Sequence, residues 1–309
     1  MNFKRFIGIA LIALVTLSAC TPKEVKNDDA SLIQVVATIG MIADAAQIIG
    51  GDKVAVTALM GPGVDPHLYK ASAGDVSRLT RADLILFNGL HLETKMGEVL
   101  EKMDANTKTK AVSETIDTER LLAAEDYDTA YDPHVWFDVS LWRQSVVAIR
   151  DSLIDADADH ADYFSSRWEA YDVQLQDLQA YVIERLSVVE KGQRVLVTAH
   201  DAFNYFGKAY EFQVRGLQGI STVSEAGTKD VQNLAQYIAD NRIAAIFIES
   251  SVPKRNVEAL QAAVKSRGFA VEIGGELFSD AMGDPGTAEG TYLGMVRHNI
   301  DTIANALGK

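Results

Sequence analysis

The chain has 309 residues, one cysteine and a formal net charge of −14 at pH 7. So acidic a surface argues against nucleic acid as a partner, because the phosphates would be repelled, and a single cysteine excludes an intramolecular disulfide and a thiolate metal site. The 290 residues that follow the first 19 leave room for two lobes, each with a core of its own.

The N-terminal segment, residues 1–19, predicts export. It carries Lys4 and Arg5, then an apolar stretch over residues 6–17 and two small residues, which is the layout of a secretory signal peptide. The stretch is shorter than the roughly 20 residues that span a bilayer, and no second run of spanning length follows it. We therefore expect an exported mature chain that is not integral to the membrane and whose net charge, without these two cations, is −16.

Cys20 follows directly after this segment, in the sequence Leu-Ser-Ala-Cys. These residues resemble the bacterial lipobox, in which the cysteine receives lipid and becomes the new N-terminus. The alternative, an incidental cysteine in a plain cleaved signal, is less compatible with its position after small residues. Residues 20–31 are polar and charged, as in a flexible tether. We expect a protein anchored by lipid to the cell membrane, in the periplasm or on the outer face of the cytoplasmic membrane.

Short β-branched runs alternate with helical patterns along the body, which predicts an α/β fold of two lobes with mostly parallel sheets flanked by helices. We place the lobes at residues 32–158 and 191–309. In the first lobe we expect strands over residues 32–39, 54–59 and 83–88 and a helix over residues 41–49; in the second, strands over residues 194–200 and 244–250 and from residue 269, and helices over residues 201–210 and 256–266 and from about residue 289.

Residues 159–190 contain no glycine or proline and place apolar residues at spacings of three and four. This pattern predicts one long amphipathic helix. At 1.5 Å per residue it would be about 45 Å long, more than either lobe needs for its own packing. We expect a single rigid helix that joins the lobes; the alternative is a helix that belongs to one lobe.

The phrase Asp-Pro-His occurs twice, ending at His67 and at His134, in loops between predicted elements. Proline constrains the backbone before each imidazole. The aspartate of each phrase, Asp65 or Asp132, could accept the second ring N–H and thereby select the tautomer. The repetition makes both histidines candidate metal ligands.

Two candidates come from the second lobe. His200 ends the predicted strand over residues 194–200, and Asp280 follows another predicted strand after the glycines at 274 and 275. Ligands of open α/β sheets bind outside the carboxyl ends of the strands, so two residues from each lobe would place one ion in the cleft between the lobes. Three imidazoles and one carboxylate suit Zn²⁺, and also Mn²⁺ if the carboxylate binds through both oxygens. Histidines so far apart are not a motif, so a surface or hydrogen-bonding role for each stays open on spacing alone.

Seven ordered phrases carry a family resemblance: MGPGVDPHLYKAS at 60–72, NGLHLETKMGEVL at 88–100, DPHVWFDV at 132–139, VLVTAHDAFNYF at 195–206, GLQGISTVSEAG at 216–227, IFIESSVP at 246–253 and GGELFSDAMG at 274–283. The chain resembles the cluster A-I solute-binding lipoproteins of bacterial metal-ion ABC transporters, most closely the TroA-type zinc and manganese binders. The resemblance extends from residue 35 to the C-terminal helix.

The resemblance implies that His67, His134, His200 and Asp280 bind one Zn²⁺ or Mn²⁺ per chain, the ion that is transported. It implies high-affinity capture outside the cytoplasm by a monomer, delivery to an ABC transporter permease with its ATPase, and a single connecting helix. Relatives devoted to manganese commonly carry Glu at the third position, where this chain has His200. Zinc relatives often insert a histidine-rich loop before the second ligand, but residues 117–131 contain no histidine. The choice of metal stays open.

The other histidines, His91, His160 and His298, are interpreted as structural or cleft-lining residues. Glu249, at the end of the predicted strand over residues 244–250, is either an acceptor for the ring N–H of a ligand histidine or a plain strand-end carboxylate.

Two other functions compete with metal capture. A secreted metallohydrolase needs an open coordination position for water, which four protein ligands would fill, and the chain lacks the His-Glu-x-x-His and Gly-x-Ser-x-Gly patterns. We therefore expect no enzyme. A surface adhesin is not indicated by repeats or long low-complexity arms, although the sequence leaves such a second role open.

Overall fold

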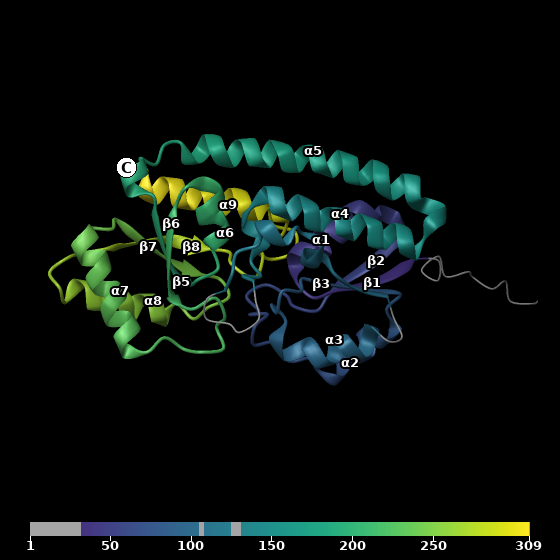
Figure 1. Ribbon diagram of the computed structural model, residues 1–309, viewed down its shortest axis with the longest axis horizontal. Coiled ribbons are helices and arrows are strands. Elements are labelled where there is room, and N and C mark those ends of the chain that lie inside the picture. The colour runs from purple at the N-terminus through teal and green to yellow at the C-terminus, as the bar shows by residue number, and fades with distance from the viewer. Residues whose placement is uncertain (1–31, 105–107, 125–130, 309) are drawn as a thin grey trace, which may run out of the picture. The chain divides into compact units, whose positions relative to one another are not determined.

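The computed structural model in Figure 1 describes residues 32–104, 108–124 and 131–308, and every structural statement below concerns these residues. The predicted signal peptide, the lipidation site at Cys20 and the tether therefore lie outside the described residues. Contacts divide the chain after Ser31, and the part from Leu32 onward forms one unit. No described helix is long and apolar enough to cross a membrane.

The N-terminal lobe is built on a four-stranded parallel sheet ordered β2-β1-β3-β4. The central strands read IQVVA and LILF and are largely buried, because helices cover both faces of the sheet. The elements of this lobe are β1 (Ile33–Ala37), α1 (Gly40–Gly50), β2 (Val54–Ala58), α2 (Ala73–Arg81), β3 (Leu84–Phe87), α3 (Gly97–Asp104), β4 (Lys108–Ala111) and α4 (Val139–Ala156).

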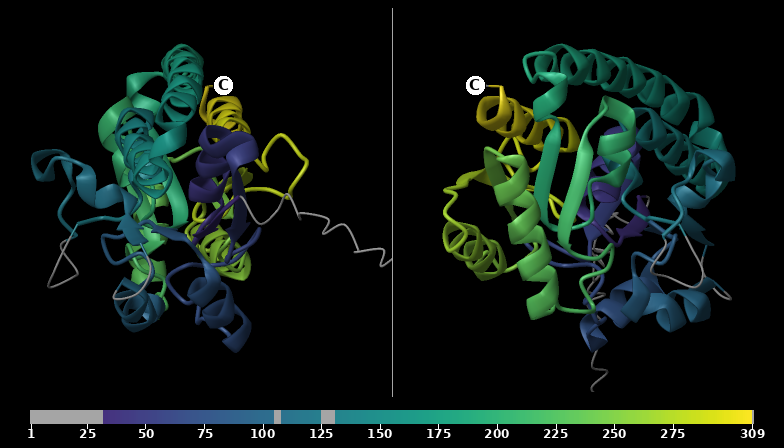
Figure 2. Two further views of the ribbon diagram at one scale, coloured as in Figure 1. Left: turned by 90° about the vertical axis from the view of Figure 1, so that its right-hand side faces the viewer. Right: turned by 60° about the vertical axis from the view of Figure 1, so that its left-hand side comes forward.

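The C-terminal lobe contains two parallel strand pairs, β5 with β6 and β7 with β8, and β5 lies beside β7. Helices α7 and α8 pack against each other on one side of these strands, as Figure 2 shows in a second view. The elements are β5 (Val195–His200), α6 (Asn204–Tyr210), β6 (Gln213–Gln218), α7 (Thr228–Asn241), β7 (Ala245–Glu249), α8 (Arg255–Lys265), β8 (Glu272–Leu277) and α9 (Tyr292–Leu307).

One long helix, α5 (Ala161–Leu186), joins the lobes and packs against α1 and α4 of the first and α9 of the second. Arg143 of α4 binds both carboxylate oxygens of Asp172 on α5, at 2.6 and 2.8 Å. Farther along α5, the Tyr181 hydroxyl donates to Asp301 of α9 at 2.7 Å. The predicted two-lobed α/β fold with a connecting helix is confirmed.

The lobes share a core instead of having two separate ones. The largest apolar cluster contains Ile42 of α1, Leu175 of α5 and Met295 of α9, all fully buried. A smaller cluster around Val197 and Ile246 belongs to the C-terminal lobe alone. The shared core places the loops of the two lobes against each other along one side of α5.

All of the expected elements occur, but several boundaries differ. The connecting helix is shorter than residues 159–190, because residues 158–160 form a 3₁₀ turn and the helix ends at Leu186. Helix α9 begins at Tyr292, where the Thr291 side chain accepts the Gly294 N–H and caps it. Helix α2 was not among the expected elements, although Ser72 and Asp75 form a capping box, which is a sequence signature of a helix N-terminus.

Candidate metal site

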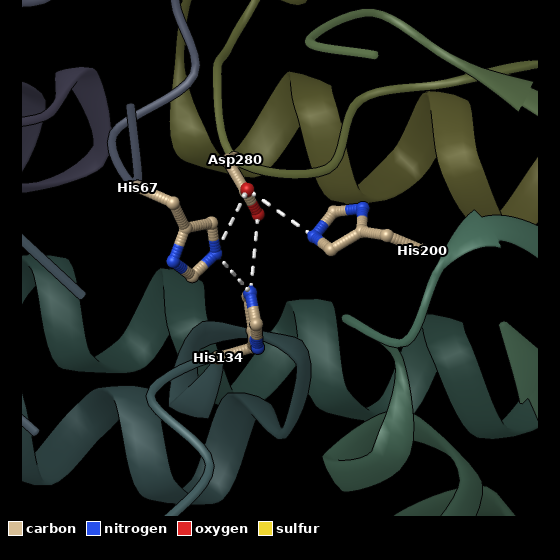
Figure 3. Close-up of side chains that lie close together, drawn as sticks. All are labelled: His67, His134, His200 and Asp280. Carbon is tan, nitrogen blue, oxygen red and sulfur yellow. Dashed lines mark hydrogen bonds and ion pairs between the residues drawn. The ribbon is translucent and has the colours of Figure 1, made fainter. Parts of the chain in front are cut away.

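The four predicted ligands converge on one point, as Figure 3 shows. Their closest nitrogen and oxygen atoms all lie within 4.8 Å of one another, and all four side chains are buried. His134 Nε2 lies 3.3 Å from His67 Nε2 and 3.4 Å from Asp280 Oδ1. Asp280 Oδ2 lies 3.5 Å from His67 Nε2 and 3.2 Å from His200 Nε2. Residues separated by up to 213 positions in the chain therefore form a single cluster.

Each ligand candidate stands at the carboxyl end of the strands, where α/β folds bind ligands. His67 lies on the loop between β2 and α2, and His134 immediately precedes the 3₁₀ turn Val135–Phe137 that leads into α4. His200 is the last residue of β5, and Asp280 follows β8 by three positions. Two residues come from each lobe, as predicted.

His134 is oriented by the carboxylate of its own Asp-Pro-His phrase. Asp132 Oδ1 lies 2.7 Å from His134 Nδ1 and also accepts the His134 backbone N–H at 2.9 Å. With its Nδ1–H donated to Asp132, the His134 ring presents an unprotonated Nε2 to the cluster. The predicted role of Asp132 is confirmed.

His200 is oriented in the same way by Glu249. Glu249 Oε2 lies 2.5 Å from His200 Nδ1, and Glu249 Oε1 accepts the His200 backbone N–H at 2.9 Å. Glu249 ends β7, the strand beside β5, so adjacent strand ends bring the pair together. Of the two interpretations of Glu249, the acceptor for a histidine ring is the correct one.

The parallel expectation for Asp65 is wrong. Asp65 Oδ1 accepts the His67 backbone N–H at 2.9 Å, but no hydrogen bond joins it to the ring. Asp65 Oδ2 instead accepts the Thr222 hydroxyl of the other lobe at 2.5 Å. His67 Nδ1 consequently has no hydrogen-bond partner among the described residues.

Several buried polar atoms of the cluster lack partners in the described part of the chain, namely His200 Nε2 and both carboxylate oxygens of Asp280. Buried polar atoms are rarely left unpaired without a reason. The edge of a tetrahedron around Zn²⁺ with bonds of about 2.05 Å is about 3.3 Å, which matches the separation of 3.3 Å between the two Nε2 atoms. The donor types, their facing atoms and their spacing fit a divalent metal ion.

The pKa values of His67 and His200 are shifted in opposite directions. Burial lowers the pKa of His67 to about 3, so its ring is neutral at physiological pH. Burial also disfavours the charged form of His200, but Glu249 and Asp280 outweigh it and hold its pKa well above the usual value. Burial acts to raise the pKa of Asp280, yet the nearby imidazoles of His200, His134 and His67 keep it below its usual range. In the metal-free protein, Asp280 is an anion beside a protonated His200.

The three remaining histidines lie outside the cluster, in agreement with the sequence interpretation. His91 is exposed and lines a cavity of about 10 Å³ beside His67. His160 pairs with Asp157, and His298 contacts the Glu276 carbonyl. The cavity beside His91 and His67 holds one water molecule at most.

Four residues that support the site were not predicted. Asn204 Nδ2 donates to Asp132 Oδ2 at 3.1 Å, and the Tyr205 hydroxyl donates to the Asp132 carbonyl at 2.9 Å. On the other side of His134, Asn88 Nδ2 donates to the Pro133 carbonyl at 3.0 Å, and Glu93 accepts the Asn88 backbone N–H at 2.7 Å. All four lie in the ordered phrases at 88–100 and 195–206, which are the signal that could have pointed to them.

The model of one protein family, described as zinc-uptake complex component A, periplasmic, matches residues 35–306. Among curated proteins, the chain is 58% identical over 275 residues to the zinc-binding protein TroA of Treponema pallidum (strain Nichols), covering 89% of each chain. It is 47% identical over 301 residues to the manganese-binding lipoprotein MntA of Bacillus subtilis (strain 168), covering 97% of this chain and 98% of the relative.

Among solved structures, the periplasmic zinc-binding protein TroA from Treponema pallidum superposes with a TM-score of 0.88 at 57% sequence identity. The match covers 90% of this chain and 100% of that one. Sequence and fold therefore agree along nearly the whole described chain, both lobes included.

Proposed function

Because the chain belongs to the family of periplasmic zinc-uptake components, we propose that it captures one Zn²⁺ or Mn²⁺ ion outside the cytoplasm and delivers it to an ABC transporter permease for import. The ion is cargo and not a catalytic cofactor. His67, His134, His200 and Asp280 are its proposed ligands. The observation that carries the proposal is the meeting of these four buried donors, two from each lobe, within 4.8 Å.

The donor set decides which ion binds more tightly. Three imidazole nitrogens and one carboxylate favour Zn²⁺ over Mn²⁺ by the general affinity order of divalent ions. A carboxylate that binds through both oxygens also accommodates Mn²⁺, and neither oxygen of Asp280 has another hydrogen-bond partner in the described chain. We expect zinc to win a direct competition even if manganese is transported.

The proposal includes no catalytic activity. A zinc hydrolase keeps one coordination position open for water, whereas four protein ligands complete a tetrahedral sphere here. The relatives named above are binding proteins. Burial of all four donors also keeps a substrate away from the ion.

Partners and location follow from the family and from the sequence. Relatives include metal-binding lipoproteins and substrate-binding components of ABC transporters, so we propose a permease with its ATPase as the partner. We further propose that Cys20 carries the lipid that holds the protein at the membrane and that the protein acts as a monomer. The lobes are proposed to cover residues 32–158 and 191–309, with residues 159–190 between them.

The test is metal analysis of protein purified without chelator, followed by zinc and manganese titration of the metal-free protein. We expect one ion per chain. His67→Ala, His134→Ala and His200→Ala should each lose most of the affinity, whereas His298→Ala, a histidine outside the cluster, should keep it. Full zinc affinity in the three cluster variants would remove these residues from the site.

A further inference from the structure

Trp136 links the segments that carry His134 and Asp280. It lies two positions after His134 on the 3₁₀ turn Val135–Phe137 and is fully buried. Its Nε1–H donates to the carbonyl of Ser279 at 3.1 Å, and Ser279 directly precedes Asp280. A first-lobe side chain therefore holds the backbone of a second-lobe ligand.

Tyr292 adds a second hydrogen bond between the lobes, in which the donor belongs to the second lobe and the acceptor to the first. Its hydroxyl donates to the Trp136 carbonyl at 2.8 Å, and its backbone N–H donates to Asp44 of α1 at 2.9 Å. Burial holds the pKa of Tyr292 well above its usual value, so the hydroxyl remains a donor at every physiological pH. We call the two hydrogen bonds, Trp136 to Ser279 and Tyr292 to Trp136, the interlobe clasp.

Ring packing immobilises the clasp. The indole of Trp136 meets the imidazole of His134 edge to face, with centroids 5.3 Å apart and planes at 70°. The Tyr292 ring stacks on Trp142 of α4, with centroids 5.1 Å apart and planes at 29°. Each aromatic ring is thus packed against a ring of the first lobe.

The four proposed ligands need a restraint on the position of Asp280. Both carboxylate oxygens of Asp280 lack hydrogen-bond partners among the described residues, whereas His134 and His200 are each tied to a carboxylate through Nδ1. Apart from the three imidazoles that face it at 3.2 to 3.5 Å, which are themselves proposed ligands, no described side chain holds the Asp280 carboxylate, so the backbone has a large part in setting its position. The Ser279 carbonyl, held by Trp136, is the nearest point at which that backbone is fastened across the cleft.

We propose that Trp136 and Tyr292 are positioning residues that hold His134 and Asp280 at a fixed separation and thereby set the rate at which the bound ion is released. The inference rests on the proposed function, since it presumes that these two residues are ligands. A site already arranged for the ion needs no reorganisation on binding and loses the ion slowly. Weakening the clasp lets the two ligands separate, so release accelerates while association, which depends on access to the cleft, stays nearly constant.

The experiment compares Tyr292→Phe with Tyr210→Phe in the full-length protein. Tyr210 is also buried, and its hydroxyl donates to Gln179 at 3.0 Å, between α6 and α5, so it takes part in neither hydrogen bond of the clasp. Zinc release is followed by stopped-flow mixing of loaded protein with excess chelator, association by mixing metal-free protein with Zn²⁺, and folding by the melting temperature of the metal-free form. We expect Tyr292→Phe to release zinc about tenfold faster, the change that corresponds to one buried hydrogen bond. Tyr210→Phe should release zinc at the wild-type rate.

Each outcome has a distinct meaning. Wild-type protein that binds no zinc contradicts the proposed function, whereas wild-type binding with an unchanged release rate in Tyr292→Phe contradicts the clasp. Equal acceleration by Tyr210→Phe would mean that general loosening, and not the clasp, controls release. If Tyr292→Phe does not fold, Trp136→Phe removes the other hydrogen bond and must accelerate release in the same way for the inference to stand.

Discussion

A hydrogen bond between Asp132 and Asn204 joins the two lobes next to the proposed ligand His134. Asn204 Nδ2 donates to Asp132 Oδ2 at 3.1 Å, while the other oxygen of the same carboxylate lies 2.7 Å from His134 Nδ1. A single carboxylate thus orients a ligand of the first lobe and receives a hydrogen bond from the second. The orientation of His134 is therefore coupled to a contact between the lobes.

Replacing Asp132 by Asn should weaken zinc binding by about 10- to 100-fold, the usual effect of removing the carboxylate behind a ligand histidine. The amide no longer selects the tautomer of His134 that leaves Nε2 free for the ion. Affinity is measured by competition with a chromogenic chelator. Asp83→Asn is the control, because Asp83 also accepts a backbone N–H, that of Gln34 at 2.8 Å, but lies outside the cluster. Equal losses in both variants would contradict a specific role for Asp132.

Zinc binding at pH 7 should release close to one proton per ion. The raised pKa of His200 keeps it protonated in the metal-free protein, whereas His67, with a pKa of about 3, has no proton to lose. Because the folded pKa of His200 is raised, its charge stabilises the metal-free fold fully below about pH 6.5, and this contribution is lost as pH rises through the folded pKa. Apparent zinc affinity should therefore fall as pH drops from about 7 to 5.

Calorimetry in two buffers of different ionisation enthalpy counts the released protons. Glu249→Gln removes the largest influence that raises the pKa of His200, so this variant should release fewer protons at pH 7. Proton counts that are equal in wild type and variant would contradict the assignment of the released proton to His200.

Replacing His200 by Glu should narrow the preference for zinc over manganese, because a hard carboxylate suits Mn²⁺ better than an imidazole does. In this chain the new carboxylate would face Glu249, which now lies 2.5 Å from His200 Nδ1, so the single variant should bind both ions weakly. The double variant His200→Glu with Glu249→Gln removes that repulsion. Its ratio of zinc to manganese affinity should fall by on the order of tenfold. Parallel titrations with the two ions measure the ratio, and an unchanged ratio would argue that residue 200 is not a ligand.

Cys20→Ser should move the protein from the membrane fraction to the soluble fraction of exported material. Its zinc affinity should stay at the wild-type level, because all four proposed ligands lie in the unit that begins at Leu32. Cell fractionation and a zinc titration check the two statements separately. Retention of the variant in the membrane fraction would contradict the lipid anchor.

Metal loading should change the dimensions of the protein only slightly. Helix α5 is continuous from Ala161 to Leu186, contains no glycine or proline and packs against helices of both lobes, so it resists wide bending of one lobe away from the other. Small-angle scattering curves of metal-free and zinc-loaded protein should nearly superimpose. A large decrease in the radius of gyration on loading would exclude a rigid connector.

The sequence by itself predicted most of the described strands, the connecting helix and the candidate ligands. Alternating apolar patterns, a stretch without glycine or proline and a histidine at a strand end report on local structure, and the Asp-Pro-His repeat and the family resemblance identify His67, His134, His200 and Asp280. These signals depend on residue type and short spacing, both of which can be read along the chain.

Only the tertiary structure decided which groups form hydrogen bonds with the rings of those ligands. The two Asp-Pro-His phrases are identical in sequence, yet Asp132 binds the ring of His134 whereas Asp65 turns to Thr222 of the other lobe. Likewise, nothing local to Trp136 indicates that it meets Ser279 and Tyr292, more than 140 positions away. Contacts of this kind form because α1, α4, α5 and α9 share one core. Packing brings the loops of the two lobes together, and the distances between their side chains then select the hydrogen bonds.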